Sequence, residues 1–461
     1  MLWVAEEGVV LGRSHLGVAT RRLFAFAQDR RGSVIIYLAL GISVMIGAAG
    51  LGVEVAAWYA QKRDMQNAAD LGAEGAAMSL KANPPGSSTQ DGYARKEAKS
   101  ATSLHGYADG TNGTAVTVNI PPQSGSYTGS TYNHKAAEVN ISKPATLYFA
   151  ALFLPSVPTI NVRAVARLTP AGDCMLATDP TASEAVAVIG NASVNVACGI
   201  GDNSDAPDAL YLQGNATLVT SATLTVNGQL STTGNAYTLS AGTSDIGNGS
   251  TITDPYASTA FPSLNPSCTT CTLVSKASLT ALTATSGTIT GGGVYTGGLD
   301  VSGTLNLNNG IYYIDGTDGS GYALFVKNAT LNTSNATIVM TSSVGGSSIG
   351  PMEIDANGTL NLTAPTSSTS TTQGMAIIQD PSVPVGTDNH MQANSTISVT
   401  GAMYFPSGGF SMQGTPSWAS TACTQIIADT FTLHGNPGIS DTDCSGAGAK
   451  DFGPNTVKLS E

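Results

Sequence analysis

The sequence predicts a mainly β protein. An N-terminal transmembrane helix extends into a long stem, a small α+β unit follows, and a right-handed parallel β-helix (β-solenoid) completes the chain. Three observations support this fold class. An uncharged run lies near the N-terminus, several short segments alternate apolar and polar residues, and Gly-Asn turns recur from residue 187 onward. Period-two alternation is typical of half-buried strands, and a repeat of about 20–24 residues is typical of stacked coils.

The predicted boundaries divide the 461 residues into four parts. Residues 1–31 are a basic cytoplasmic N-terminus, residues 32–81 the transmembrane helix and stem, residues 82–170 the small α+β domain, and residues 171–461 the parallel β-helix domain. A chain of this length has room for two or three folded domains and a substantial core.

Charge is unevenly distributed along the chain. Residues 168–461 contain four lysines, no arginine and twenty acidic residues, whereas residues 1–167 carry a small positive excess. Because residues 168–461 contain no arginine, they cannot form bidentate guanidinium–phosphate contacts, which argues against nucleic acid as a partner of this segment. Low overall charge with abundant Gly, Ser, Thr and Asn is typical of exported, repetitive β proteins, and the acidity indicates a solvated surface.

The run from Gly32 to Val53 is long enough, at about 1.5 Å rise per residue, to cover the roughly 30 Å hydrocarbon core of a bilayer. A cleavable signal peptide has an apolar centre of only about 7–15 residues, so a retained signal anchor is predicted. Arginines are more frequent before the run than after it, which leaves the N-terminus in the cytoplasm and the bulk of the chain periplasmic or surface-exposed. The predicted topogenic residues are Arg21, Arg22, Arg30 and Arg31. The predicted anchor residues are Ser33, Val34, Ile35, Ile36, Tyr37, Leu38, Leu40, Ile42, Val44, Met45, Ile46, Leu51 and Val53.

Three other interpretations of this segment stay open. The small residues from Gly47 to Gly50 suit signal peptidase, although they lie inside the apolar run. The stretch "TRRLF", residues 20–24, resembles a twin-arginine signal but is separated from the run by charges. A prepilin-type cut after Gly32 expects a glutamate five residues on, where this chain has Tyr37.

Helical character continues beyond the predicted membrane span. Residues 53–81 are rich in Ala, Met, Leu, Gln and Glu and contain no proline. Glu54 lies at the outer boundary, where its carboxylate can stay hydrated; a buried functional carboxylate is the alternative. A face of mostly small residues is expected to pack against a neighbouring helix or the protein's own domain. This face comprises Ala57, Ala60, Gln61, Asp64, Ala68 and Leu71.

This N-terminal block resembles the N-terminal module of the TadG-like family of Flp (tight-adherence) pilus assembly proteins. The shared features are "RRGS" at residues 30–33, the apolar helix, Glu54 before Trp58 and Tyr59, and "QNAAD" at residues 66–70. The resemblance implies a single-pass protein of the bacterial inner membrane that helps to build or anchor a surface pilus. Its implied partners are the lipid bilayer and other pilus-assembly or envelope proteins. Residues 71–75 depart from the family's alanine run, and the family's metal-binding von Willebrand-type domain is not recognisable.

Residues 88–170 predict a small α+β unit. A helix is expected within residues 89–110, and strands within residues 114–122, 136–142 and 159–170. The apolar block from Leu147 to Leu154 is too short to span a bilayer, so a buried helix is favoured over a second membrane contact. His105 and His134 are isolated and are interpreted as surface or capping residues.

From residue 187 onward, short alternating strands are separated by glycine and asparagine. Both residue types tolerate the positive φ that tight turns require. Inward Val, Leu and Ile are expected to stack from coil to coil, with Thr and Ser ladders outside; a β-sandwich is the alternative. The turn residues include Gly190, Gly214, Gly234, Asn328, Asn335, Asn357 and Asn394. Two stretches, residues 292–316 and 401–414, are similar to β-helical extensions of TadG-like proteins.

Six cysteines support an exported location. Cys174 with Cys198, and Cys423 with Cys444, lie near the two ends of the β region. If joined, each pair would stabilise the fold by about 3 kcal/mol and could clamp the terminal coils. Cys268 and Cys271 form a C-x-x-C, interpreted as a loop disulfide rather than a redox or zinc motif.

The sequence offers no convincing chemistry. The loop at Asp315 departs from a D-x-S-x-S metal motif. Glu353 and Asp355 share one face of a strand, as in polysaccharide-acting β-helices, but no basic residue is expected nearby to bind a uronate, which favours a solvated face. No catalytic residue, metal, cofactor or small-molecule substrate is therefore predicted. The expected function is structural, in pilus assembly or envelope attachment. A surface adhesin-like protein and a polysaccharide-acting enzyme are the alternatives.

Overall fold

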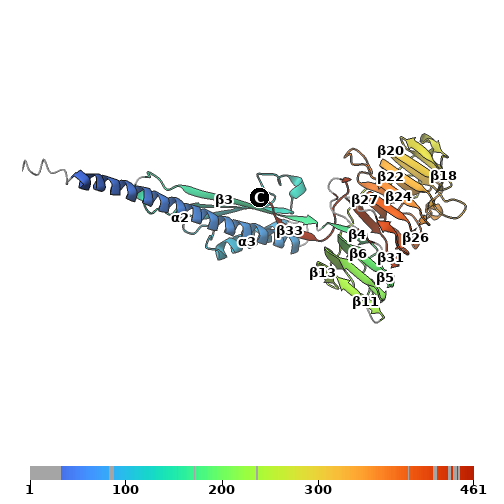
Figure 1. Ribbon diagram of the computed structural model, residues 1–461, viewed down its shortest axis with the longest axis horizontal. Coiled ribbons are helices and arrows are strands. Elements are labelled where there is room, and N and C mark those ends of the chain that lie inside the picture. Colours follow the sequence, from blue (N-terminus) through green and yellow to red (C-terminus); the bar gives the residue numbers. More distant parts are fainter. Residues whose placement is uncertain are drawn as a thin grey trace, which may run out of the picture. The chain divides into compact units, whose positions relative to one another are not determined.

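The chain folds into two compact units, which a computed structural model describes (Figure 1). Unit 1 comprises Met1–Leu168 with Val457–Glu461, and unit 2 comprises Thr169–Thr456. The described residues are 33–82, 88–152, 154–170, 172–234, 237–392, 394–418, 423–434, 438–439, 444 and 447–461. The predicted cytoplasmic N-terminus, with Arg21, Arg22, Arg30 and Arg31, lies outside them, as do the side chains of Ser33, Val34 and Ile36.

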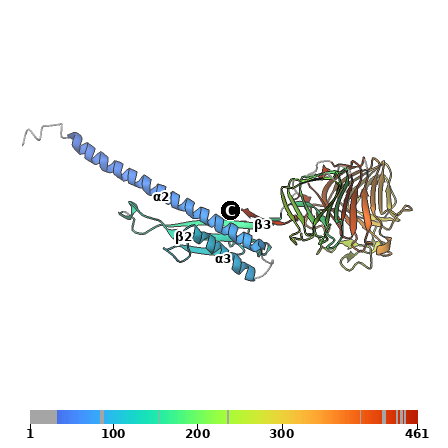
Figure 2. The same cartoon turned by 90° about the horizontal axis from the view of Figure 1, so that it is seen from below.

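Unit 1 is built on one uninterrupted helix, α2 (Ser33–Ala82), of 50 residues. At about 1.5 Å per residue it is roughly 75 Å long. A second helix, α3 (Ser88–Leu104), packs against its C-terminal half and ends before Gly106, whose φ of 86° stops the helix. The predicted helix within residues 89–110 is confirmed. Figure 2 shows that α2 continues well beyond α3 toward its N-terminus.

An antiparallel sheet completes unit 1. Strands β1 (Ala115–Asn119), β2 (Ala136–Pro144) and β3 (Thr159–Pro170) pair in that order, which confirms the three predicted strands. The fourth strand, β33 (Asn455–Leu459), joins the edge of β3 and was not predicted to lie here. Two 3-10 turns, η2 (Ser130–Tyr132) and η3 (Ala150–Leu152), lie in the loops.

The core of unit 1 lies between the sheet and the small residues of α2. Its members on α2 are Met65, Ala68, Ala69, Ala73, Ala76, Ala77 and Leu80. The predicted packing face is wrong at Ala60, Asp64 and Leu71, which are exposed. Ala68 lies in the core, and Gln61 bonds to the loop after β2. Alanine occurs on several faces of this helix, so the spacing of small residues does not select one. The face is set by where α3 and β2 dock.

The two glycines that interrupt the family's alanine run differ in their surroundings. A Cβ on Gly72 would lie 2.8 Å from Thr102 Cγ2 and 3.3 Å from the Ala98 carbonyl oxygen. A Cβ on Gly75 would lie 3.6 Å from Glu97 Cγ, an ordinary contact. Gly72 thus permits the close approach of α3, and Gly75 does not serve that purpose.

We expect Gly72→Ala and Gly75→Ala to change stability in opposite directions. Gly72→Ala should lower the free energy of unfolding of unit 1 by about 1–3 kcal/mol, because α3 must move outward. Gly75→Ala should raise it by about 0.5–1 kcal/mol, because alanine loses less conformational entropy than glycine when the unfolded chain becomes helical. Hydrogen exchange at the buried amides of α3 measures both changes. Equal shifts in the two variants would contradict this packing.

Unit 2 consists mostly of parallel strands stacked in long sheets, so the predicted mainly β, solenoid-like class is confirmed. The 14-stranded sheet contains β4 (Asp173–Ala177), β7 (Gly199–Asp202), β10 (Thr223–Val226), β13 (Thr243–Ile246), β16 (Ala281–Leu282), β17 (Gly287–Thr290), β18 (Gly293–Thr296), β20 (Thr304–Asp315), β22 (Thr330–Thr341), β24 (Thr359–Thr363), β25 (Met375–Gln379), β27 (Thr396–Phe405), β29 (Ser417–Trp418) and β30 (Thr424–Ala428).

Three smaller sheets complete the unit. The 9-stranded sheet contains β5 (Val186–Gly190), β8 (Leu210–Gly214), β11 (Leu230–Thr233), β19 (Leu299–Val301), β21 (Leu324–Lys327), β23 (Met352–Asp355), β26 (Thr387–Met391), β28 (Gly408–Met412) and β31 (Phe431–His434). The 4-stranded sheet contains β6 (Ser193–Val196), β9 (Thr217–Thr220), β12 (Thr238–Ser240) and β32 (Gly438–Ile439). A short pair, β14 (Pro262–Ser263) with β15 (Thr272–Leu273), and the turns η4 (Lys276–Ser278) and η5 (Gly346–Ser348) lie between them.

The stacking order does not follow the chain order. The 14-stranded sheet runs β13-β10-β7-β4-β30-β27-β24-β22-β20-β18-β16, so the first coil (β4) and the last coil (β30) are neighbours in its interior. Met175 pairs with Ile426 across this junction. Cys174 is bonded to Cys198, and Cys423 to Cys444. The expectation that these bonds clamp terminal coils is wrong, because β4 and β30 each have neighbours on both sides.

A crossover segment, residues 247–280, connects the two outer ends of the stack. Along its length it bonds to several coils: Ile252 N–H donates to Asn203 Oδ1 at 2.7 Å, and Tyr404 Oη donates to Asp254 Oδ2 at 2.8 Å. Tyr256 and Phe261 pack against Tyr404, with ring centroids 5.5 and 5.1 Å away. The crossover segment therefore covers the outer face of the 14-stranded sheet, which is apolar there.

Turn chemistry agrees with the sequence. Asn328, Asn335, Asn357 and Asn394 have φ between 51° and 64°, as the predicted turns require. Asparagine side chains also form hydrogen-bonded ladders between coils. The sequence analysis expected such ladders from Thr and Ser. Asn361 donates to Asn332, and Asn332 to Asn306, at 2.9 and 2.8 Å. An amide both donates and accepts, so it can continue such a ladder from coil to coil.

Candidate functional site

The N-terminal half of α2 presents apolar side chains outward. All of the predicted anchor residues lie on this helix, and those whose side chains are described are exposed, among them Leu40, Val44 and Leu51. The helix Tyr37–Lys81 is long and apolar enough to cross a membrane, and only 11% of its most apolar 18-residue window is buried. The core helix of a soluble protein would be mostly covered, so this surface needs an apolar environment.

Glu54 marks the end of the uncharged run and fixes a distant loop to it. Its side chain is 1% exposed. The carboxylate accepts the backbone N–H groups of Phe149 at 2.7 Å, Tyr148 at 3.1 Å and Ala150 at 3.2 Å. The expectation that Glu54 stays hydrated is therefore wrong. Three consecutive amides replace water around the carboxylate, and such charge-assisted bonds are stronger than neutral ones.

Two further α2 side chains hold the same loop. Trp58 Nε1 donates to the Thr146 carbonyl at 3.1 Å. Gln61 Nε2 donates to the Pro144 carbonyl at 3.0 Å, and its Oε1 accepts the Thr146 N–H at 2.9 Å. Glu54, Trp58 and Gln61, spaced four and three apart, lie on one side of the helix. We call them the loop latch.

The loop held by this latch is apolar and exposed. We define the apolar loop as the described residues between β2 and β3, 145–152 and 154–158. Tyr148 is 62% exposed, and Phe149, Leu154 and Val157 are also exposed. The prediction of a buried helix from Leu147 to Leu154 is wrong, because only the short turn η3 forms. The loop packs against α2 rather than into the core of the sheet.

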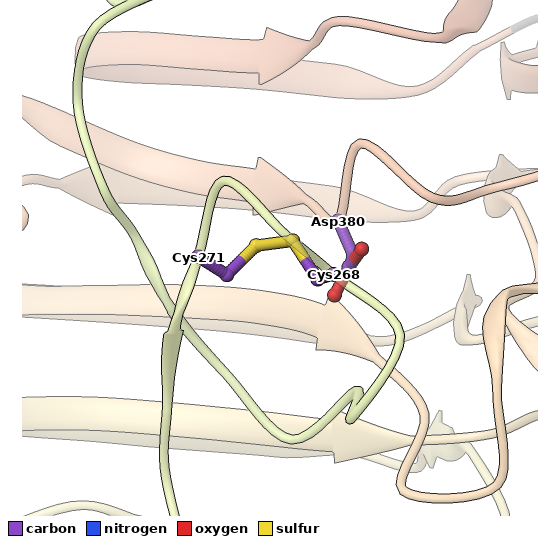
Figure 3. A group of neighbouring side chains, drawn as sticks. All are labelled: Cys268, Cys271 and Asp380. Carbon is purple, nitrogen blue, oxygen red and sulfur yellow. A yellow bond between two sulfur atoms is a disulfide. The ribbon is translucent and has the colours of Figure 1, made fainter.

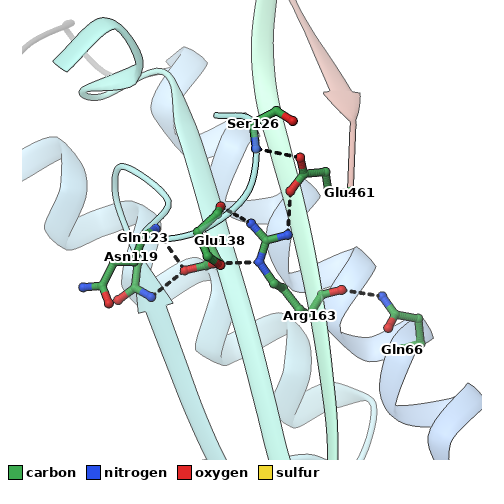
Figure 4. A network of polar contacts seen from close by, with 8 residues as sticks. Gln66, Asn119, Gln123, Ser126, Glu138, Arg163 and Glu461 are labelled. Carbon is green, nitrogen blue, oxygen red and sulfur yellow. Dashed lines mark hydrogen bonds and ion pairs between the residues drawn. The ribbon is translucent and has the colours of Figure 1, made fainter. Parts of the chain in front are cut away.

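A polar network ties the sheet of unit 1 together (Figure 4). Glu138 on β2 is buried and accepts from Arg163 Nε at 2.5 Å and from Asn119 Nδ2 at 2.7 Å. Arg163 also donates from Nη1 to Glu461 Oε2 at 2.6 Å, and its carbonyl accepts from Gln66 Nε2 of α2 at 2.9 Å. The network thus connects α2, β2, β3 and the segment after β33.

The same network controls the ionisation of Glu138. Burial alone would raise the pKa of its carboxyl. Hydrogen bonds from Asn119, Arg163, Gln123 and Ser124 outweigh burial and lower the pKa to about 2. Sequence analysis missed this group. The signal that could have found it is a pair of opposite charges, Glu138 and Arg163, on one face of two predicted strands, opposite the apolar face.

One group of potential metal ligands occurs in the part of the chain that the structure describes. Atoms of Cys268, Cys271 and Asp380 lie within 4.8 Å of one another (Figure 3). The two sulfurs form a disulfide and therefore offer no thiolate. Asp380 is buried and accepts from Thr341 Oγ1 at 3.0 Å and from the Ser263 hydroxyl. The group secures the crossover segment, in which Ser263 lies.

The carboxylates considered for sugar chemistry are both paired with bases. Lys327 Nζ lies 2.6 Å from Asp355 Oδ2, and His390 Nδ1 lies 3.3 Å from Glu353 Oε2. The expectation that no basic residue is near is wrong, because parallel stacking brings residues of adjacent coils side by side. Bonds to Asp388 and Glu353 raise the pKa of His390 to about 10, so it is a cation at neutral pH. Both carboxylates are thus engaged in ion pairs and do not form an open pair.

Comparison with known proteins identifies the first part of the chain. Residues 32–79 match the family model described as putative Flp pilus-assembly TadE/G-like. Among solved structures, the competence-associated pilin ComZ from Thermus thermophilus is similar over 77% of this chain and 90% of that chain, with 12% identity and a TM-score of 0.22. A TM-score this low does not establish a common fold, so no argument is drawn from it. No curated protein matches the chain in sequence.

Proposed function

Because residues 32–79 are a TadE/G-like Flp pilus-assembly domain, we propose that this protein is a membrane-anchored, non-enzymatic component of Flp (tight-adherence) pilus assembly or envelope attachment. The N-terminus lies in the cytoplasm, the N-terminal half of α2 spans the inner membrane, and the rest of unit 1 with all of unit 2 lies on the periplasmic side. Its partners are the bilayer and other pilus-assembly or envelope proteins. The observation that carries this proposal is the exposed apolar half of α2, which coincides with the matched domain.

In this proposal unit 2 is a right-handed parallel β-helix that presents a rigid surface to those partners. The parallel registers between successive coils support it, for example Leu224 beside Ile200 and Leu331 beside Leu305. Three disulfides among the described residues suit an oxidising compartment such as the periplasm. Residues 82–170, with β33 and the residues after it, form the small α+β domain, which packs against the C-terminal half of α2.

Membrane fractionation with a charged variant tests the anchor. Ile42 lies near the middle of the apolar run, and an arginine there costs about 2.5–3.5 kcal/mol of insertion free energy. Ile42→Arg should therefore shift protein from the membrane pellet to the soluble fraction. The matched control is Tyr93→Arg, at an exposed position of α3, which should stay in the pellet. Wild-type protein found free in the cytosol with reduced thiols would refute the proposal.

Crosslinking in intact envelopes tests the pilus role. Affinity capture of the full-length protein should recover other pilus-assembly components, and Ile42→Arg should lose them while Tyr93→Arg retains them. Recovery of envelope proteins unrelated to the pilus, at equal yield from cells with and without the pilus machinery, would contradict the assignment to pilus assembly.

A further inference from the structure

We infer that the apolar loop is a second membrane contact. It inserts into the bilayer leaflet on the side of the folded units, beside α2, and the space between loop and helix takes a lipid acyl chain. The inference rests on the proposed membrane anchorage of α2. It adds a contact that neither the family match nor the hydropathy of the chain assigns.

The first argument is depth. The ring of Phe149 lies over Gly50, where a Cβ would come within 2.9 Å of the ring. Gly50 precedes Glu54 by one helical turn, so this contact lies within the predicted membrane span. Figure 2 shows the connection between β2 and β3 reaching along α2 beyond the end of α3. The loop therefore extends into the zone that the anchor itself occupies.

A cavity between the loop and α2 reaches deeper. It has a volume of about 520 Å³. It is lined by Ser43, Ile46, Gly47, Leu51, Glu54 and Trp58 of the helix and by Phe149, Ala150 and Leu154 of the loop. Gly47 is seven residues before Glu54, or about 10 Å along the helix axis. The lining is mostly apolar, and its carboxylate already accepts the loop amides, so the cavity suits an acyl chain better than water.

The second argument is the backbone of the loop. Irregular backbone is costly in lipid because unpaired N–H groups cannot bond to water there. Glu54 accepts the N–H groups of Tyr148, Phe149 and Ala150, and the Ala150 carbonyl accepts the N–H of Leu154 at 2.8 Å. A loop in water would not need a buried carboxylate for three consecutive amides. The loop latch thus prepares this segment for an apolar environment.

The third argument is composition and continuity. Residues 144–158, "PATLYFAALFLPSVP", carry no charge. Their exposed side chains adjoin the exposed apolar surface of α2 at Leu51, which lines one cavity with Phe149 and Leu154. Trp58 and Tyr148 sit where that surface ends, and such aromatic residues favour the interface between lipid and water. A lipid leaflet would cover helix and loop together.

Spin-label accessibility in vesicles tests this inference. The full-length protein is reconstituted in phosphatidylethanolamine–phosphatidylglycerol vesicles, and a nitroxide is attached through an encoded ketone amino acid, which leaves the cysteines untouched. The label replaces Tyr148 in the loop, Leu40 in the anchor, or Tyr93 on α3. All three positions are exposed in the folded protein. Relaxation by oxygen reports lipid, and relaxation by a water-soluble nickel chelate reports solvent.

We expect the Tyr148 label to have a several-fold higher ratio of oxygen to nickel accessibility than the Tyr93 label. The ratio should be below that of the Leu40 label, which lies near the middle of the span. The loop contact would be overturned if the Tyr148 label were as accessible to nickel as the Tyr93 label. If the Leu40 label were still shielded from nickel, the proposed anchor would stand. Nickel accessibility at Leu40 would instead overturn the proposed anchor. A Tyr148 label shielded from both reagents would show protein covering the loop and would also overturn the lipid contact.

The latch has its own variant. Glu54→Ala leaves three amides without an acceptor, so the Tyr148 label should gain several-fold in nickel accessibility while the Leu40 label stays unchanged. The control is Glu74→Ala, which removes a carboxylate from α2 far from the loop. Unchanged accessibility at Tyr148 in Glu54→Ala would show that the carboxylate does not hold the loop in the leaflet.

Discussion

Arg163→Met is expected to lower the free energy of unfolding of unit 1 by about 3–5 kcal/mol. The variant keeps most of the aliphatic volume but leaves Glu138 buried without its cation, and removing one member of a buried ion pair costs more than the pair contributes. It also removes the ion pair with Glu461, in which Arg163 Nη1 lies 2.6 Å from Glu461 Oε2. Hydrogen exchange at the amides of β2 and β3 measures the loss. Arg95→Met, at an exposed position of α3, is the control and should change little.

The pH dependence separates the ion pair from simple packing. The pKa of Glu138 is about 2 in the folded protein, below its ordinary value of 4.5. Its contribution is therefore fully present above pH 4.5 and is lost as pH falls toward 2; the difference corresponds to about 3 kcal/mol. Arg163→Met raises that pKa, so its stability should depend less on pH in this window than that of the wild type. Parallel pH profiles for the two proteins would contradict this account.

Phe410→Ala is expected to lower the stability of unit 2 by about 3–5 kcal/mol. Phe410 on β28 is fully buried, with ring centroids 5.8 Å from Phe405 and 6.0 Å from Phe431. Removing the ring leaves a cavity between coils that the neighbouring strands cannot close without losing their register. Because β31 pairs with β5, protection from hydrogen exchange should fall in the first coil as well as around β28.

The control for this variant is Phe325→Ala. Phe325 lies on the outward face and stacks on Tyr322 at 5.2 Å, so its loss should cost about 1 kcal/mol. A loss of protection confined to β28, with β5 unaffected, would contradict the pairing of the first and last coils.

Local features of this chain could be predicted wherever a residue type or a short pattern has a single structural explanation. Asparagine and glycine before short strands need positive φ, and Asn328 and Asn357 have it. The alternation in residues 136–142 and 159–170 defines a half-buried antiparallel pair, and β2 and β3 form it. The uncharged run from Gly32 to Val53 has the length and composition of a membrane span, and its helix keeps those side chains exposed.

Long-range features were not predictable in the same way. The cysteine spacing is compatible with disulfides in the two terminal coils of a stack, but it does not indicate which coils are neighbours. Glu54 looked hydrated because its partners, Tyr148 to Ala150, lie more than ninety residues away in sequence. The block from Leu147 to Leu154 was expected in the core because hydropathy does not show that Glu54 holds this segment against α2. In each case the missing information is a tertiary contact.

The adjacency of the first and last coils has a consequence for biogenesis. Thr178 donates to the Ala428 carbonyl, a contact between residues 250 positions apart. Because the chain is synthesised from its N-terminus, β4 emerges early and β30 late, so one side of the first coil stays unpaired until the last coil has formed. Such long-range pairing is slow, because loop closure must precede it. The exposed strand edge can meanwhile pair with other chains, so a chaperone that shields it would raise the yield of folded protein.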